Sequence, residues 1–383
     1  TGGAVVTSQF LGAGKKEDAC KSAKQLIVSS VCITIGISIL VMVFCNSIIS
    51  LFFGKIEADV FHNAVIYMMI SALSFPFLAL YNSCAALFRS MGNSQITLKV
   101  SIVENIINIG GDAFGVYVLG LGVAGVAIPS LISRAVAGFI LYHLLKNPSN
   151  EVHLLKESFH IDWPVIHKIF YIGIPSGIEN GIFQLGRVIV VSIIAGFGTV
   201  QIAANGVANS LDSMGCIVGQ AMNLAMITVI GRCVGAGDSG QVRYYTKKLL
   251  KITYLCTFMV NSVILLCLSW ILKCYGLSPE TTQLSYILVM IHNGMAMFLW
   301  PASFVLPNML RACNDVRFTM VLSIFSMFVF RIGFSYIIGV NMGYGAIGVW
   351  IAMVLDWIFR VICFVSRYLS GHWLKTARLQ DNR

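Results

Sequence analysis

The sequence predicts an all-α polytopic membrane protein with two six-helix lobes, the first of which lacks about two helices in this chain. Three observations carry this prediction. The 383 residues are 57% hydrophobic and 11% charged, whereas a soluble domain carries about 25% charged residues. Apolar runs of membrane-spanning length recur from end to end. Landmarks from the first half of the chain return in the second half in the same order.

Ten apolar runs are long enough to cross a bilayer. Each must be a helix, because a lone strand would leave backbone groups without hydrogen bonds in lipid. The runs are 26–53, 63–88, 97–119, 122–145, 169–195, 200–232, 247–275, 281–310, 317–341 and 344–369.

The repeat is defined by three landmarks that return 222 or 223 positions later: Gly12-Ala13-Gly14 as Gly235-Ala236-Gly237, Arg89 with Asn93 as Arg311 with Asp315, and Gly122–Ala127 as Gly345–Trp350. An ordered repeat at one offset indicates a duplicated module. In a chain this apolar, such a module is typical of transporters built from two halves. An even number of spans per copy makes the halves parallel repeats, related by a pseudo-two-fold axis along the membrane normal.

The symmetry of the copies also predicts the domain limits. Residues 1–11 match the end of a second span, so the first span and most of the second are expected to precede Thr1 in the parent protein. We therefore expect an incomplete N-terminal lobe over 1–145 and an aqueous linker over 146–168. A C-terminal lobe of six spans follows over 169–369, with a basic tail over 370–383.

The net charge of +10 does not indicate nucleic-acid binding, because of where the charges fall. Twenty of the 26 Lys and Arg lie in alternate loops and the tail, while Lys55 and Lys273 lie in the opposite loops. Basic loops of this kind are cytosolic. The sequence thus predicts a multi-pass protein of the cytoplasmic membrane, with the lipid bilayer as its partner and the C-terminus in the cytosol. The scattered cysteines form no Cys-x-x-Cys pair, so no metal site is expected.

An ordered set of motifs resembles the multidrug and toxic compound extrusion (MATE) transporters over essentially the whole chain. The motifs are the two Gly-Ala-Gly segments with basic residues after them, Arg-x-x-x-Asn/Asp at 89–93 and 311–315, Asn108-x-x-x-Asp112 followed by Gly120–Gly125, and Ile172-Gly173-Ile174-Pro175. The resemblance implies two lobes around a central cleft that opens alternately to either side. It also implies export of amphipathic, often cationic, drugs and other organic compounds. The driving force would be inward proton or sodium flow, with no cofactor beyond that ion.

The chain departs from the family pattern at two places. The acid that one branch carries on its first helix falls in the missing part. The acid that another branch carries on its tenth helix is absent from 281–310, which disfavours that branch's sodium site. Glu179 is the candidate for the acid of the seventh helix. It lies only four residues after Pro175, which is earlier in the helix than the resemblance leads us to expect.

Ionisable residues inside spans are functional candidates, because a charge in hydrocarbon costs a few kcal/mol. Asp112 is the strongest. It shares an arc of about 100° of one helix with Ser101, Glu104, Asn105 and Asn108. Carboxylate and amide oxygens suit a hard cation, and the carboxylate alone can take a proton. The alternative is a hydrogen-bonded helix contact. On the same helix, Gly111-x-x-x-Gly115 predicts close packing against a neighbour.

The second half carries two further polar faces and one predicted ion pair. Asn205, Asn209, Asp212, Cys216, Gln220 and Asn223 form a stripe that predicts either a wetted cleft wall or a network between helices. Ser176, Asn180, Gln184 and Arg187 share a face with Glu179 at its edge. Glu179, Asn180, Gln184, Asn209 and Asp212 are the candidates for ion or substrate contacts here. Asp356 and Arg360, four apart, are expected to neutralise each other.

Other function classes are less well supported by the sequence. The chain has no phosphate-binding loop and no protease or hydrolase motif, so neither an ATP-driven pump nor an enzyme is expected. The main alternative is a flippase of lipid-linked sugar precursors, whose pyrophosphate would need cationic side chains in the cleft, such as Arg134, Arg187 and Arg331. Export of organic cations instead predicts that acids dominate there. A channel or a receptor remains a third class.

Overall fold

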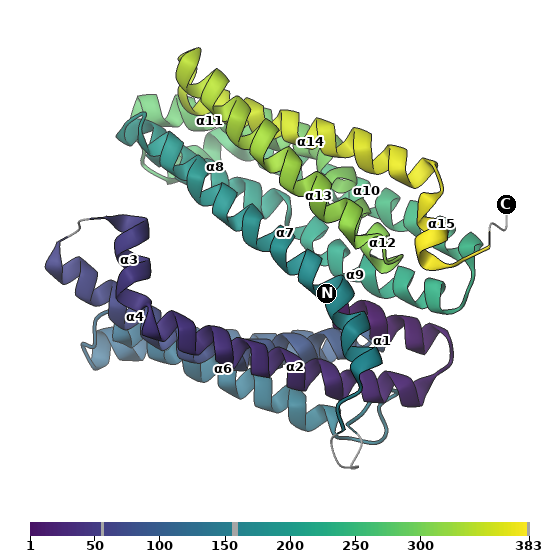
Figure 1. The fold of residues 1–383 in the computed structure, drawn as a ribbon. Coiled ribbons are helices and arrows are strands. Elements are labelled where there is room, and N and C mark those ends of the chain that lie inside the picture. The colour runs from purple at the N-terminus through teal and green to yellow at the C-terminus, as the bar shows by residue number, and fades with distance from the viewer. Residues whose placement is uncertain (55–56, 155–159, 381–383) are drawn as a thin grey trace. The chain divides into compact units, whose positions relative to one another are not determined.

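A computed structural model describes residues 1–54, 57–154 and 160–380, and it divides the chain into two compact units. The N-terminal unit is Val6–Phe170, and the C-terminal unit is Tyr171–Arg383 with Thr1–Val5. Within the described ranges every regular element is a helix (Figure 1). The predicted all-α class is therefore confirmed.

The N-terminal unit is built around a layer of long helices. Its elements are α2 (Lys16–Val43), α3 (Cys45–Phe53), α4 (Ala58–Ser90), α5 (Ser94–Ala113), the π-helical turn η1 (Phe114–Val118) and α6 (Ala124–Leu145). Helix α4 packs on α2 and α6, and α5 packs on α6. Two helices, α1 (Gly2–Gly12) and α7 (Trp163–Ala195), run across the boundary between the units.

The C-terminal unit holds the remaining elements. They are α8 (Thr199–Gly215), α9 (Ile217–Gly235), α10 (Ser239–Cys274), α11 (Pro279–Trp300), η2 (Pro301–Val305), α12 (Leu306–Ala312), α13 (Val316–Ser326), η3 (Met327–Gly333), η4 (Ser335–Asn341), α14 (Gly345–Leu369) and α15 (His372–Ala377). Two apolar clusters form its core. One gathers Trp300, Trp357 and Phe364, and the other gathers Trp350 with Leu211 and its neighbours.

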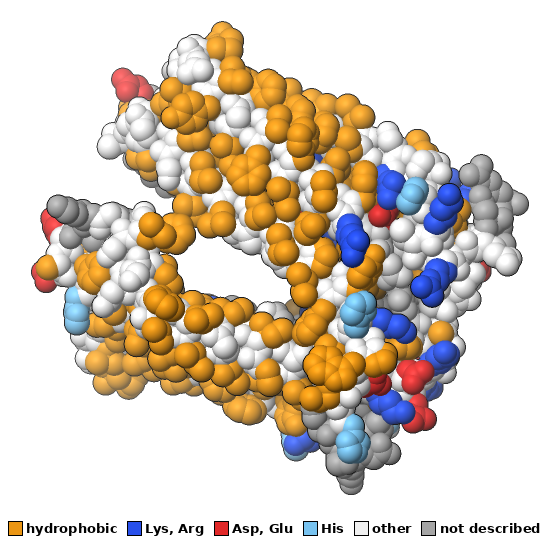
Figure 2. Space-filling view, viewed as in Figure 1, with side chains coloured by type: hydrophobic (Ala, Val, Ile, Leu, Met, Phe, Trp, Pro, Cys, Tyr) orange, Lys and Arg blue, Asp and Glu red, His pale blue; other side chains and the backbone are white. Residues whose placement is uncertain are grey.

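Nine helical segments in the described part of the chain are long and apolar enough to cross a membrane. Helix α5 with η1 occupies the remaining predicted span, 97–119, and carries Lys99, Glu104 and Asp112. Exposed apolar side chains cover the flanks of the helices, while Lys and Arg of the C-terminal unit gather at one end of it (Figure 2). Apolar flanks with basic ends are the pattern expected of helices in a bilayer.

Several predicted spans are interrupted in the structure. The run 26–53 breaks at Phe44 and the run 200–232 at Cys216, while π-helical turns enter 97–119, 281–310 and 317–341. At the Cys216 break, Asn261 donates to the Gly215 carbonyl at 3.1 Å and Asn293 to the Leu211 carbonyl at 3.3 Å. Two amides from other helices thus satisfy carbonyls at the break. Hydropathy does not reveal such breaks, because one residue changes neither the length nor the polarity of a run.

The repeated landmarks adopt matching backbone conformations in both halves. Gly14 and Gly237 have φ of 73° and 74°, Gly92 and Asn314 have 79° and 64°, and Gly122 and Gly345 have 57° and 59°. Positive φ is the region where glycine is favoured, and it closes helix ends. At both copies of the second landmark, the residue of positive φ also donates its N–H to the arginine carbonyl three residues back, in Gly92–Arg89 and Asn314–Arg311. The duplication seen in the sequence therefore extends to local structure.

The predicted close packing of α5 is present. A Cβ on Gly111 would lie 2.6 Å from the Pro129 Cβ of α6, and Gly115 lies directly against Gly125. The second half has an equivalent contact, because a Cβ on Gly348 of α14 would lie 2.8 Å from the Gly339 nitrogen of η4. Small residues let these backbones approach, and in the first half the approach brings the polar edge of α5 against α6.

Candidate functional site

In the N-terminal unit, Asn108 and Asp112 lie at the edge of α5 that packs on α6. Asn108 Nδ2 donates to Ser130 Oγ at 2.9 Å, and Ser130 donates to the Val126 carbonyl at 3.1 Å. Asp112, one turn later, is half-buried, and no described group pairs with its buried Oδ1. The α5 arc therefore faces protein at Asn108 and keeps a carboxylate oxygen unpaired at Asp112, where a proton or cation would neutralise it.

Glu104 has a different environment on the same arc. It is half-buried and lies within the electrostatic reach of Arg134 of α6. Arg134 Nη1 in turn donates to Ser74 Oγ of α4 at 2.6 Å. Glu104 therefore feels a nearby positive charge, whereas no described contact gives Asp112 a counter-charge.

In the C-terminal unit, Asp212 of α8 is paired with a residue that the sequence did not single out. Its Oδ1 lies 2.9 Å from His292 Nδ1 of α11. The Cys216 Sγ donates a hydrogen bond to this oxygen at 3.5 Å. The Asp212 side chain keeps 23% of its surface exposed, whereas His292 keeps 3%.

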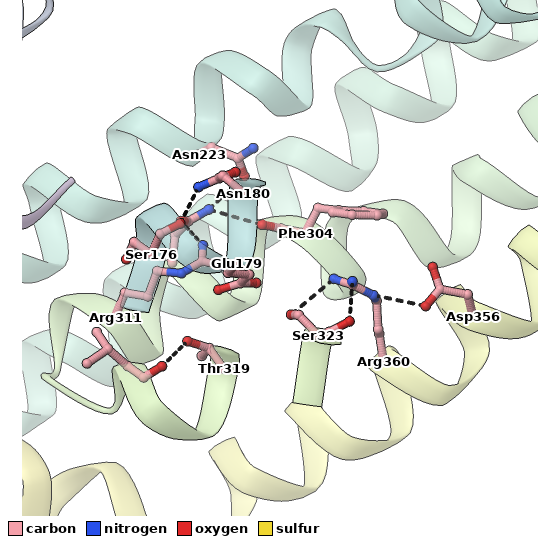
Figure 3. Close-up of polar contacts among 12 residues, drawn as sticks. Ser176, Glu179, Asn180, Asn223, Phe304, Arg311, Thr319, Ser323, Asp356 and Arg360 are labelled. Carbon is pink, nitrogen blue, oxygen red and sulfur yellow. Dashed lines mark hydrogen bonds and ion pairs between the residues drawn. The ribbon is translucent and has the colours of Figure 1, made fainter. Parts of the chain in front are cut away.

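A buried ionic cluster lies close to this pair. Asp356 is fully buried and accepts from Arg360 Nε at 3.1 Å, which confirms the predicted neutralising pair (Figure 3). A second guanidinium, Arg331 of η3, places its Nε 3.3 Å from Asp356 Oδ2. Arg360 also donates to the hydroxyl and the carbonyl of Ser323, each at 3.3 Å. One carboxylate therefore holds two arginines inside the unit.

The candidate polar residues of helix α7 lie in two environments, one buried and one exposed. Glu179 is buried and accepts from Arg311 Nη2 at 2.7 Å (Figure 3). Asn308, which accepts from Arg311 at 2.5 Å, donates to Asn223 Oδ1 of α9 at 2.9 Å. Asn180 and Gln184 are exposed. Glu179 is thus engaged inside the unit, and the two amides present their side chains outward.

The long polar stripe of α8 and α9 is in part a network between helices. Asn205 is buried and accepts from Trp350 Nε1 at 3.0 Å, and Cys216 is also buried. Asn209 and Asp212 are half-exposed, and Gln220 is exposed. The stripe is therefore not exposed to water along its whole length. Asn205 belongs to a network between helices, while Asn209 and Asp212 are accessible.

Sequence reasoning missed three residues of these sites. Ser130 and His292 were not recognised, and Arg331 was named only as a possible cation for a pyrophosphate head group, not as a partner of Asp356. The signal for His292 was available, because histidine is among the residues that are rare and functional at membrane depth. Its pairing with Asp212 could not be predicted, because Asp212 lies 80 positions earlier in the chain, on another helix. Within the described residues no group of three His, Cys, Asp or Glu is placed to hold a metal ion.

Apolar helices of membrane length that carry ionisable groups at membrane depth in both units define a polytopic membrane protein, and such groups are typical of transporters. The sequence profile of the MatE family matches residues 1–114 and 175–337. The chain therefore belongs to the MatE family, and the relatives below are named as transporters or as probable multidrug resistance proteins, not as enzymes.

Two curated relatives and two solved structures illustrate the match. The uncharacterized transporter YisQ of Bacillus subtilis is 28% identical over 98% of this chain and 83% of its own length. The probable multidrug resistance protein NorM of Thermotoga maritima is 24% identical over 100% and 82%. A multidrug resistance MATE family transporter in an outward-facing conformation aligns with a TM-score of 0.90 at 20% identity, covering 98% and 83% of the two chains. A MOP superfamily transporter from Pyrococcus furiosus, described as having reversed binding-pocket polarity, aligns at 0.89, with 20% identity and the same coverage. At this identity the structures bear on the fold alone.

Proposed function

We propose that this protein exports amphipathic organic compounds, often cations, across the cytoplasmic membrane in exchange for inward-moving cations. The observation that carries the proposal is the Asp112 carboxylate, half-buried on α5 with an oxygen that no described group neutralises. A buried anion of this kind is costly until it takes a proton or a cation. The probable multidrug resistance protein NorM of Thermotoga maritima, similar along the whole chain, favours organic compounds as the cargo.

The proposed coupling step is a change of charge at Asp112. When the carboxylate is charged, the edge of α5 next to Ser130 favours an aqueous or cation-filled environment. When it is neutralised, the same edge packs without a desolvation penalty. Alternating access would follow if the two states of α5 favour different arrangements of the lobes. Organic cations and the coupling ion would then compete for one carboxylate, which gives exchange in place of co-transport.

In the C-terminal unit, the accessible polar residues are the proposed substrate contacts. Asn180 and Gln184 are exposed on α7, and Asn209 is half-exposed on α8. Amide groups can orient a ligand without adding a charge of their own. Glu179 would contribute only after release from Arg311, because their 2.7 Å ion pair occupies one of its oxygens.

The balance of accessible charge favours cation export over the flippase alternative. Arg331 and Arg360 are 5% and 2% exposed and are held by Asp356. Arg134 is occupied by Ser74. Of the four arginines inside spans, only Arg187 is exposed. Recognition of a pyrophosphate head group needs free cationic side chains. Among the described residues inside spans, Arg187 is one such side chain, whereas the carboxylates of Asp112 and Asp212 are both partly accessible.

The proposed orientation places the basic ends in the cytosol. Lys and Arg of the C-terminal unit gather at one end (Figure 2), and the loops of this end include those between α9 and α10 and between α12 and α13. Basic residues are retained on the cytoplasmic side. The short helix α15 would then lie at the cytosolic surface of the membrane.

The function is tested by transport in liposomes containing the purified full-length protein. A proton gradient and a sodium gradient are imposed separately, and export of the cation tetraphenylphosphonium is followed. Gradient-driven export is expected for the parent, and Asp112→Asn is expected to reduce it by at least about fivefold. Asp59→Asn, which removes an exposed carboxylate at the start of α4, is the matched control and should match the parent.

Two results would contradict the proposal. Unchanged gradient-driven export in Asp112→Asn would remove this carboxylate from the coupling step. Failure to move any organic cation, together with movement of a labelled polyprenyl diphosphate lipid, would favour the flippase.

A further inference from the structure

Helix α10 carries basic side chains on the face that it turns away from the rest of the C-terminal unit. The exposed residues of its first turns include Tyr244, Lys247, Lys248 and Lys251. At 100° per residue they fall within an arc of about 100°. Val242, Thr246 and Thr253 are buried on the opposite side, where α10 packs on α9 and α11. The three lysines, which form the lysine face, therefore lie on the outer surface of the unit.

The lysine face continues directly into an apolar face. Leu255, Phe258 and Leu266 lie in the same arc and are 60%, 48% and 86% exposed. Helix α10 is one of the segments that are long and apolar enough to cross a membrane. Large apolar side chains exposed along such a helix are expected to contact acyl chains. The lysine face therefore borders on lipid and not on a loop.

The spacing of charges along α10 matches the thickness of a bilayer. Between Lys251 and Lys273 the helix carries no charged residue, and this stretch spans about 33 Å at a rise of 1.5 Å per residue. The hydrocarbon core of a bilayer is about 30 Å thick. Lys251 thus lies at one edge of the hydrocarbon, with Lys247 and Lys248 about one turn further out. All three ammonium groups reach the layer that holds lipid phosphates.

The charge of the lysine face is not neutralised within the protein. The chain has no acidic residue between Asp238 and Glu280, and Asp238 caps α10 by accepting from the Gln241 N–H at 2.9 Å. Lys248 donates to the hydroxyl of Tyr244 at 3.4 Å. None of the ion pairs among the described residues involves the lysine face. The face is therefore complementary to an anion that comes from outside the chain.

The first copy of the repeat has no equivalent of this face. At the offset of 223, Gln25 and Val28 of α2 stand at the positions of Lys248 and Lys251. Gln25 is buried and donates its amide to the His160 carbonyl at 2.5 Å, so a residue of the linker meets α2 here. The lysine face belongs to the second copy alone and does not follow from the duplication.

We propose that the lysine face binds an anionic phospholipid from the leaflet on the basic side of the membrane. Its ammonium groups hold the headgroup phosphate, and an acyl chain lies along Leu255 and Phe258. Ammonium groups donate charge-assisted hydrogen bonds to phosphate oxygens, and lysine clusters beside a membrane span attract anionic lipids. The Tyr244 ring, with Lys248 Nζ 5.4 Å from its centroid, is an amphipathic side chain of the kind found at headgroup level.

The position of the face favours a lipid over a soluble phosphate. Exposed lysines alone hold a soluble anion weakly, because water and salt screen their charge. A phospholipid adds apolar contact with Leu255 and Phe258 and is confined to the membrane beside them. The proposal concerns the membrane partner of α10, so it does not depend on which compound is exported.

The direct test is lipid retention by the purified full-length protein, measured by native mass spectrometry in detergent. Phosphatidylglycerol, which is anionic, and phosphatidylethanolamine, which has no net charge, are added at equal concentration. The parent is expected to retain phosphatidylglycerol preferentially. Replacing the whole lysine face with glutamine (Lys247→Gln, Lys248→Gln and Lys251→Gln together) should lower this retention by at least about tenfold, because each lysine contributes about fivefold.

Two matched variants separate a site from a general effect of charge. Replacing Lys16, Lys21 and Lys24 of α2 with glutamine removes the same charge from the first copy and should match the parent. Replacing the lysine face with arginine keeps the charge and should retain the lipid. Because the lysine face is exposed, its glutamine variant should also keep the unfolding midpoint of the parent, which shows that lost retention is not lost folding.

A second measurement locates the bound lipid. Phosphatidylglycerol with a photoreactive diazirine in its acyl chain should label the α10 peptide that contains Leu255 and Phe258 in the parent and not in the glutamine variant of the lysine face. Excess glycerophosphoglycerol, the headgroup without acyl chains, should not prevent this labelling.

Three results would overturn the lipid site. They are equal retention of the two phospholipids by the parent, an equal loss of phosphatidylglycerol in the α2 variant, and displacement of the lipid by glycerophosphoglycerol, which would point to a soluble anion instead.

Discussion

Replacing Asp356 by asparagine should strongly destabilise the C-terminal unit. The carboxylate is fully buried, lies 3.1 Å from Arg360 Nε and 3.3 Å from Arg331 Nε, and also accepts from Ser326. Asparagine keeps the shape and removes the charge. Two guanidiniums, 5% and 2% exposed, are then left without their shared counter-ion.

The magnitude follows from the geometry of the cluster. Breaking a buried ion pair by removing one partner costs about 3–5 kcal/mol, because the other charge stays desolvated. Asp356→Asn leaves two such charges, so we expect the upper part of this range. The assay is denaturant unfolding in detergent, followed by tryptophan fluorescence, to which Trp350 and Trp357 contribute from the same helix.

A second substitution separates charge from packing. Asp356→Asn with Arg360→Met removes one of the stranded charges and should recover part of the lost stability, because the two sites interact directly. Asp59→Asn, at an exposed position, should stay within about 0.5 kcal/mol of the parent. The reasoning is refuted if Asp356→Asn costs less than about 1 kcal/mol, or if adding Arg360→Met makes the protein less stable still.

Three further predictions concern packing, backbone conformation and thiol reactivity. Gly111→Ala puts a Cβ 2.6 Å from that of Pro129 and should lower the free energy of unfolding by about 1–3 kcal/mol. At Gly110 a Cβ meets no described atom within 4 Å, so Gly110→Ala should be neutral or stabilising. Equal unfolding midpoints for the two variants would contradict this prediction. Asn314 has φ of 64°, so Asn314→Gly should be tolerated, and Asn314→Val should lower the free energy of unfolding by about 1–2 kcal/mol in the same assay. Equal effects of the two substitutions would show that the left-handed conformation is not required. Burial raises the pKa of the Cys313 thiol well above its ordinary value, so its thiolate stays scarce as pH rises from neutral to mildly alkaline. N-ethylmaleimide, followed by mass spectrometry, should label the exposed Cys274 and leave Cys313 unmodified. Equal labelling of the two cysteines would refute the shift.

Local pattern predicted much of the fold and part of the candidate site. The polar edge that holds Asn108, the small edge that holds Gly111 and the pairing of Asp356 with Arg360 all depend on which residues share one face of one helix. Helical periodicity determines that face. The roles of Asp112 and the other candidate residues stay predictions until transport is measured.

Contacts between distant segments were not predictable in the same way. Glu179 looked like a member of an open polar face, yet its carboxylate turns into the unit to meet Arg311, 132 positions away. The break at Cys216 was hidden because the amides of Asn261 and Asn293, which satisfy its carbonyls, come from two other helices. A single sequence does not state which helices will be neighbours.

The sequence by itself determined that the chain crosses a membrane, that its helices come from a duplicated module, and that charged groups lie at membrane depth. These properties follow from composition, run length and repeat spacing, which need no partner. Only the tertiary structure decided which of those charges are neutralised. Asp356 holds two arginines, Arg311 holds Glu179, and His292 meets Asp212, while Asp112 makes no ion pair among the described residues. The physical reason is that the cost of a buried charge is set by the groups within a few ångströms of it, and helix packing brings those groups together from distant parts of the chain.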